Sequence, residues 1–252
     1  EGCGKINSQS LAARSLKKFK LGGSKGMYWD NDCGNLSAAN IQCCSLTNFF
    51  LTDGTSIQLQ MWNLPALQEL RISYCSSLTS IGQPGQVFIN LTSLTISNCR
   101  KLSTIDGLLE EEYLPAIKSI TIDDCEKLST IESRRIGDFS SLKDLKVSSC
   151  HKINWAGLVL PSSLQSLHLY SCGDISSFIP SGLENLQSLV SLNLLWCENI
   201  RSIPGHLWSS TLSSLQELQI LYCWGLVSIG GADDISEIQN VLIEGCFRLN
   251  MK

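Results

Sequence analysis

The chain has 252 residues, which is enough for one compact domain or one repeat array. Hydrophobic residues make up 43% of it and charged residues 17%, a balance that excludes an intrinsically disordered chain. The formal net charge of -4 does not favour nucleic acid or an anionic membrane as partner, and no apolar run approaches the roughly 20 residues of a membrane-spanning helix.

Residues 1–45 are irregular. Leu16, Phe19 and Leu21 predict one short strand, and residues 22–39 are rich in Gly, Asn and Asp, which predicts a loop. Residues 1–6 (EGCGKI) match residues 244–249 (EGCFRL), which form the second half of a repeated unit. We therefore expect the chain to begin in mid-repeat, at a fragment boundary, because a natural solenoid carries a polar cap at its end.

Residues 46–249 contain regular repeats. The first copy, residues 46–59, is degenerate, and eight copies of the pattern LxxLxLxxCxxLxxI follow it. Their cysteines recur at intervals of 24, 26, 25, 22, 25, 26 and 23 residues, at Cys75, Cys99, Cys125, Cys150, Cys172, Cys197, Cys223 and Cys246. This pattern is typical of leucine-rich repeats. We expect a single domain over residues 1–252 with about ten repeats, of which those in 1–45 are irregular and truncated.

The LxL segment of each copy alternates apolar and polar residues, so it predicts a short strand with both apolar side chains pointing inward. Strands of successive repeats should stack in parallel, with their outward residues on a concave face. The later LxxI residues return to the core from the convex side. The sequence thus predicts an α/β repeat solenoid, a leucine-rich-repeat horseshoe with a concave parallel β-sheet and a mostly irregular or short-helical convex side.

The repeated cysteine predicts a buried, reduced thiol at the turn after each strand, where a small side chain that contacts neighbouring backbone fits. A column of reduced thiols favours a reducing compartment over a disulfide framework. Cys33, Cys43 and Cys44 lie in the irregular region. Zinc is the alternative interpretation for these three, but no paired CxxC spacing supports it, and we predict no metal site.

No catalytic constellation is present. The sequence lacks the P-loop, GxGxxG, GxSxG and HExxH patterns. His151, His168 and His206 occupy three different repeat positions, and only His168 is predicted to face the concave side. We therefore predict that the chain is not an enzyme and carries no cofactor.

The units at 91–105, 142–153, 189–203 and 215–229 resemble the leucine-rich repeats of plant nucleotide-binding leucine-rich-repeat immune receptors. The form with Cys in the turn is similar to that of the cytosolic coiled-coil class of these disease resistance proteins, and the resemblance covers residues 46–249. It implies a cytoplasmic, or also nuclear, domain with two tasks. One is to recognise a pathogen effector or a guarded host protein, and the other is to restrain the receptor's own nucleotide-binding domain, which this chain lacks.

One stretch of the predicted concave face is aromatic and aliphatic. We call it the aromatic patch, and it consists of His168, Tyr170, Leu195, Trp196, Leu221 and Tyr222. Stacked strands lie about 4.8 Å apart, so these side chains should be contiguous. The patch is predicted to bind a partner protein, because Trp and Tyr are common hot-spot residues. The alternative is that the side chains pack on one another and stiffen the sheet.

A basic surface is predicted near the start of the chain, formed by Arg14, Lys17, Lys18 and Lys20. Such a run is usually a solvated face. By analogy with the resembled receptors, it is also a candidate contact with the nucleotide-binding domain.

Two other protein classes use similar units. One is the substrate-recruiting adaptor of an F-box ubiquitin ligase, and the other is an enzyme inhibitor built like ribonuclease inhibitor. Both carry a regular helix after the cysteine turn, whereas this chain has Gly-, Pro- or Ser-rich segments there, such as residues 82–85 and 161–163.

Overall fold

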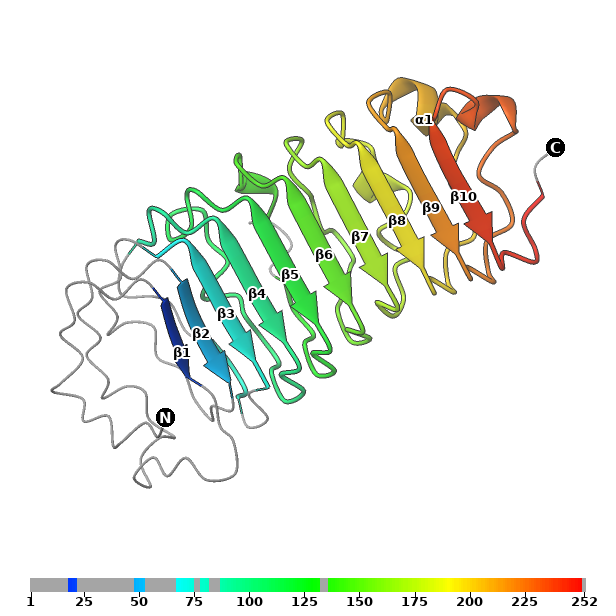
Figure 1. The fold of residues 1–252 in the computed structure, drawn as a ribbon. Coiled ribbons are helices and arrows are strands. Elements are labelled where there is room, and N and C mark those ends of the chain that lie inside the picture. Colours follow the sequence, from blue (N-terminus) through cyan, green and yellow to red (C-terminus); the bar gives the residue numbers. More distant parts are fainter. Residues whose placement is uncertain are drawn as a thin grey trace, which may run out of the picture. The chain divides into compact units, whose positions relative to one another are not determined.

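The computed structural model describes residues 18–21, 48–52, 67–74, 78–81, 87–131 and 136–250. The chain divides into two compact units, Glu1–Thr130 and Ile131–Lys252. Each unit holds five short strands, and within each unit the strands of Figure 1 follow one another in chain order.

The first unit contains a parallel sheet. Its strands are β1 (Lys18–Leu21), β2 (Asn48–Thr52), β3 (Glu69–Ser73), β4 (Ser93–Ser97) and β5 (Ser119–Asp123). Each strand pairs in parallel with the next, and the register aligns equivalent repeat positions, such as Leu70 with Leu94 and Leu94 with Ile120. Isolated parallel bridges join Ser80, Thr104 and Thr130 on the return segments of these repeats.

The second unit has the same architecture. Its strands are β6 (Asp144–Ser148), β7 (Ser166–Tyr170), β8 (Ser191–Leu195), β9 (Glu217–Leu221) and β10 (Asn240–Glu244), all parallel and paired in chain order. Among the described residues the helices are short. They are η3 (Ile136–Asp138), η4 (Ser181–Leu183), α1 (His206–Ser210) and η5 (Asp233–Ile235). The predicted leucine-rich-repeat solenoid of parallel strands with few helical residues is therefore confirmed.

The LxL residues form the core, as the alternation predicts. From β3 to β5 and from β6 to β9 their side chains are almost fully buried: Leu70, Ile72, Leu94, Ile96, Ile120, Ile122, Leu145, Val147, Leu167, Leu169, Leu192, Leu194, Leu218 and Ile220. Full burial of one such side chain contributes about 1.5–3 kcal/mol. In β10 the equivalent residues are more exposed, because no described strand lies beyond it.

From β3 to β10, each strand is followed by a residue with left-handed backbone, directly before the repeat cysteine. The φ angles range from 47° to 59° at Tyr74, Asn98, Asp124, Ser149, Ser171, Trp196 and Tyr222, and Gly245 stands at the same position in the last repeat. The N–H of such a residue extends the ladder by one bond; that of Trp196, for example, donates to the Leu221 carbonyl at 2.9 Å. The turn then directs the cysteine side chain inward.

The cysteine thiols are buried and bonded to backbone. Cys172 Sγ donates to the carbonyl oxygens of Val147 at 3.1 Å and Tyr170 at 3.3 Å, so it links its own turn to the preceding repeat. The seven cysteines from Cys99 to Cys246 are free thiols, and all but Cys246 are buried. The prediction of small, inward side chains at this position is confirmed for the six buried cysteines, and their reduced state stays a prediction.

Candidate functional site

The aromatic patch lies on the outward face of β7, β8 and β9. The strand register places Tyr170, Leu195 and Leu221 side by side in one row, as the spacing predicts. Tyr170 and Trp196 are exposed, whereas the other patch residues are half-buried. The patch is therefore a contiguous surface that is open to solvent mainly at Tyr170 and Trp196.

Trp196 and Tyr222 occupy the next row, at the left-handed ends of β8 and β9. Their rings stack with centroids 4.8 Å apart and planes inclined by 25°. Trp224 packs edge-on against Trp196, with centroids 5.4 Å apart. Sequence reasoning missed Trp224, which follows the cysteine and was not assigned to the outward face. The sequence signal that could have placed Trp224 beside the patch is its position two residues after Tyr222.

A chain of polar side chains runs beside the patch. His168 Nε2 lies 2.7 Å from Ser166 Oγ, and His168 Nδ1 lies 2.8 Å from Asn193 Nδ2. Asn193 Nδ2 also donates to Ser191 Oγ at 3.1 Å. The chain continues through Glu217, which accepts from the Ser191 hydroxyl at 3.0 Å and from the Gln219 amide at 2.8 Å.

Asn193 was not selected from the sequence, although it sits at the centre of this polar chain. It belongs to an outward row of the sheet and is nevertheless only 5% exposed. Among the residues that the structure describes, none donates to its Oδ1 atom, which is buried. An unpaired buried carbonyl costs about 1–3 kcal/mol, so this atom calls for an explanation.

The surroundings of His168 favour its neutral form. Burial lowers the pKa of His168, and Lys146 acts in the same direction, while Glu217 and Asp144 oppose them. A neutral imidazole fits the hydrogen bonds, because Nδ1 then accepts from Asn193 and Nε2–H donates to Ser166. At the other end of the patch the Tyr222 hydroxyl donates to Glu244 at 3.3 Å, and the charge of Glu244 raises the pKa of Tyr222.

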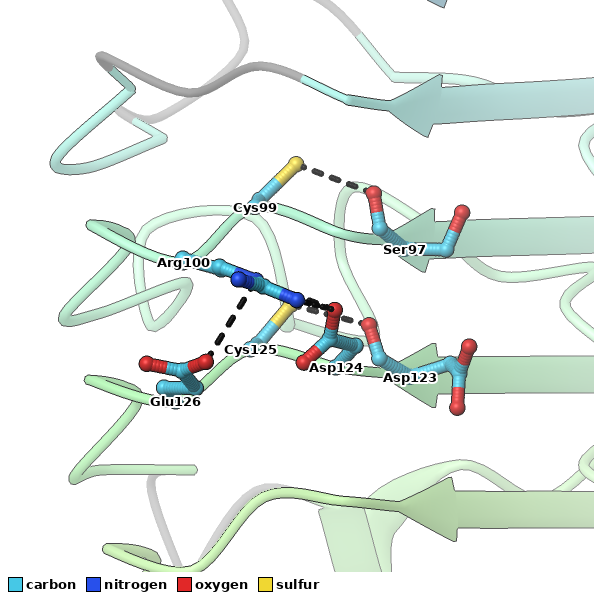
Figure 2. A network of polar contacts seen from close by, with 7 residues as sticks. All are labelled: Ser97, Cys99, Arg100, Asp123, Asp124, Cys125 and Glu126. Atoms are coloured by element: carbon cyan, nitrogen blue, oxygen red, sulfur yellow. Dashed lines mark hydrogen bonds and ion pairs between the residues drawn. The ribbon is translucent and has the colours of Figure 1, made fainter.

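The first unit has a different polar cluster at the turns after β4 and β5. Arg100 bonds to Asp124 at 3.1 Å and to Glu126 at 3.3 Å, so it bridges two successive repeats (Figure 2). The same view shows the thiols of Cys99 and Cys125 bonded to the carbonyls of Ser97 and Asp123. Arg100 is largely exposed, and exposed ion pairs contribute little, so we interpret this cluster as a tie between repeats.

The predicted basic surface lies largely outside what the structure describes. Arg14 and Lys17 are outside the described residues, and Lys18 and Lys20 are known only as backbone positions in β1. The suggested zinc ligands Cys33, Cys43 and Cys44 are also outside the described residues. Their roles stay predictions.

No arrangement for catalysis is evident in the described parts of the chain. His151 and His206 are exposed on turns or on α1, away from the strand rows that carry His168. Burial raises the pKa of the Cys172 thiol to about 12, which makes it a poor nucleophile. No group of three or more potential metal ligands and no helix able to cross a membrane occurs among the described residues.

Comparison with curated proteins finds one from Arabidopsis thaliana, described as a candidate disease resistance protein, which is 29% identical over 158 residues. These residues make up 62% of this chain but only 11% of the relative, so the match concerns about a tenth of that protein's length. No protein-family model matches the sequence.

Two solved structures share weaker likenesses. An internalin, InlF, from Listeria monocytogenes aligns over 97% of this chain and 88% of its own, with 14% identity and a TM-score of 0.40. The complex of TLR13 with a single-stranded RNA aligns over 96% and 70%, with 11% identity and a TM-score of 0.19. Likenesses of this strength support no conclusion on function.

Proposed function

We propose that the chain is the protein-recognition domain of an intracellular plant immune receptor, and that its aromatic patch binds a pathogen effector or a guarded host protein. The repeat array over residues 1–252 acts as one domain in this proposal and works in the cytoplasm or also in the nucleus. The resemblance of the repeats to plant resistance proteins and the match to the Arabidopsis relative support this role.

The observation that carries the proposal is the backbone conformation under Trp196 and Tyr222. Both residues are left-handed, which costs an L-residue with a Cβ atom about 1–2 kcal/mol. Most other repeats have Asn, Asp, Ser or Gly at this position, and those residues suit the conformation better. Trp196 is also 37% exposed, so core burial does not offset the cost. Tyr74 shares this backbone conformation, but at Trp196 and Tyr222 the two rings also stack and adjoin Leu195 and Leu221. Selection for binding accounts for this contiguous pair better than selection for stability does.

The alternative classes fit less well. An F-box adaptor or a ribonuclease-inhibitor-like protein needs a regular helix in each repeat. The described repeats contain a single α-helix, α1, of five residues. We therefore favour the immune-receptor domain. In it, the basic residues Arg14, Lys17, Lys18 and Lys20 are proposed to meet the nucleotide-binding domain and restrain it.

The test is a pull-down from plant leaf extract with the immobilised chain. The double variant Trp196→Ala/Tyr222→Ala removes both stacked rings. Tyr74→Ala is the matched control, since Tyr74 is an exposed aromatic with the same left-handed backbone at the same repeat position. Circular dichroism checks that each variant is folded.

We expect a protein that is retained by the unmodified chain and by Tyr74→Ala but not by the double variant. With that protein purified, the double variant should weaken the Kd by at least about tenfold, since a hot-spot residue contributes more than about 1 kcal/mol. Equal retention by all three proteins would mean that the rings only stiffen the sheet.

A further inference from the structure

The surrounding hydrogen bonds determine which amide atom of Asn193 is the unpaired oxygen. Glu217 is a carboxylate and can only accept, so the single hydroxyl hydrogen of Ser191 is used in the 3.0 Å bond to Glu217. Ser191 Oγ must therefore accept from Asn193, and the group that faces it at 3.1 Å must be the amide nitrogen. The second amide hydrogen is directed to His168 Nδ1. These bonds leave Oδ1 as the free end of the side chain.

A free acceptor in this position needs a hydrogen-bond donor, and none of the described residues supplies one. The surrounding charge selects the kind of donor. The outward strand positions from β6 to β10 carry three carboxylates, Asp144, Glu217 and Glu244, but one ammonium, that of Lys146. Excess negative charge favours a cationic donor over a neutral one.

The rows of the sheet define a path for such a donor. Trp196 and Tyr222 lie at the strand ends, Leu195 and Leu221 form the next row, and Asn193 and Gln219 the row after that. Outward rows two residues apart are separated by about 7 Å, which matches the length of an arginine side chain. A stem that lies over the two leucines thus brings its charged group above Asn193 and Glu217, both of which bond to Ser191. Asn193 Oδ1 is buried, so the side chains that cover it must shift as the charged group enters.

We propose that the aromatic patch recognises an arginine side chain of its protein partner, which donates to Asn193 Oδ1 and to the Glu217 carboxylate. The guanidinium is planar and has five N–H donors, so it can serve both acceptors and replace Gln219 on Glu217. Trp196 and Tyr222 lie where the stem begins, so their stacked rings offer contact area to the partner's chain beside the arginine. This inference rests on the proposed protein-binding role of the patch and names the chemistry of the partner.

The experiment selects displayed random peptides on the immobilised chain and discards those that also bind Trp196→Ala/Tyr222→Ala. Peptides that pass are synthesised with arginine and with citrulline, its neutral isostere, and their Kd values are measured. The receptor variants are Asn193→Leu, which removes the acceptor at similar volume, and Glu217→Gln, which removes the charge at a partly exposed position. Tyr74→Ala is again the control, and circular dichroism verifies folding.

We expect the patch-dependent peptides to share an arginine. Replacing it with citrulline, or replacing Asn193 or Glu217 in the receptor, should weaken binding by tenfold or more, while Tyr74→Ala has no effect. If Asn193→Leu fails to fold, the Kd values of Glu217→Gln and of the citrulline peptides test the arginine assignment. Patch-dependent peptides without a shared arginine, or with equal affinity after the citrulline exchange, would overturn the arginine assignment and leave the binding role of the patch intact. Recovery of no patch-dependent peptide would count against both.

Discussion

Hydrogen-bond polarity at single residues decides what the patch can bind. His168 must be neutral for Nδ1 to accept from Asn193, and the structure provides this, because burial and Lys146 lower the pKa of His168 against the pull of Glu217 and Asp144. On protonation, Nδ1 would become a donor and would face the amide nitrogen of Asn193. The protonation state of one histidine is therefore linked to both stability and the orientation of the free acceptor.

The linkage has a defined sign. Because the folded-state pKa of His168 lies below that of the unfolded chain, the unfolded state binds the proton first as the pH falls. The contribution of His168 is complete above the unfolded pKa of about 6.5 and is lost as the pH falls from there toward the folded value. We expect the unmodified chain to lose more stability than His168→Gln between pH 7.5 and 5.5, measured by urea unfolding. Parallel losses in the two proteins would show that His168 is not linked to folding.

At this scale the sequence predicts part of the site. Strand alternation and repeat spacing are sufficient to place Tyr170, Leu195 and Leu221 in one row and Trp196 beside Tyr222. They could not identify Asn193, because the alternation predicts an exposed side chain at this outward position, whereas Asn193 is buried. The repeat pattern likewise does not predict the edge-on contact between Trp224 and Trp196, since this contact depends on the path of the turn after the cysteine.

The strand-ending turn is the element that repeats most uniformly in the described chain. Its left-handed residue continues the ladder, and the following cysteine bonds to backbone within its own turn and often in the preceding repeat. The repeat pattern predicted the strand and the inward cysteine. It could not reveal the left-handed residue, because Tyr, Asn, Asp, Ser and Trp all occupy that position and share no side-chain property. Gly245 carries the strongest sequence signal of positive φ, and Asn98 and Asp124 carry a weaker one.

The strain of this turn can be measured at Ser171, which has a φ of 50° and an N–H that donates to Leu195 O at 2.9 Å. Ser171→Gly should raise the free energy of unfolding by about 0.5–1 kcal/mol, because glycine adopts this conformation without steric cost. Ser171→Val should lower it by about 1–2 kcal/mol, because a β-branched side chain fits it worst. Urea unfolding measures both.

The control for Ser171 is Ser162→Gly, at an exposed position that does not have positive φ. It should leave stability unchanged or lower it slightly, because glycine there only adds freedom to the unfolded chain. Equal effects of glycine at both serines would mean that the left-handed turn stores no strain.

At the scale of the repeat array, stability comes from repeats that bury one another's apolar faces. The contribution of a core side chain to the free energy of unfolding therefore depends on how completely the neighbouring repeats cover it. Within the second unit, β9 lies between β8 and β10, whereas β10 is paired with β9 alone among the described strands. The repeat pattern predicts the same inward role for both strands. The difference in their burial cannot be read from the pattern, because it depends on whether a further repeat covers the strand.

Ile220 and Ile243 test this directly, since they are register partners of the same residue type. Ile220 is fully buried, whereas Ile243 is only half-buried. Ile220→Ala should lower the free energy of unfolding by about 2–5 kcal/mol, the range for a buried isoleucine that leaves a cavity. Ile243→Ala removes the same atoms from a site that water already reaches, so it should cost less than half as much. Urea unfolding of the two variants gives the comparison, and equal losses would mean that β10 is covered as completely as β9 in solution.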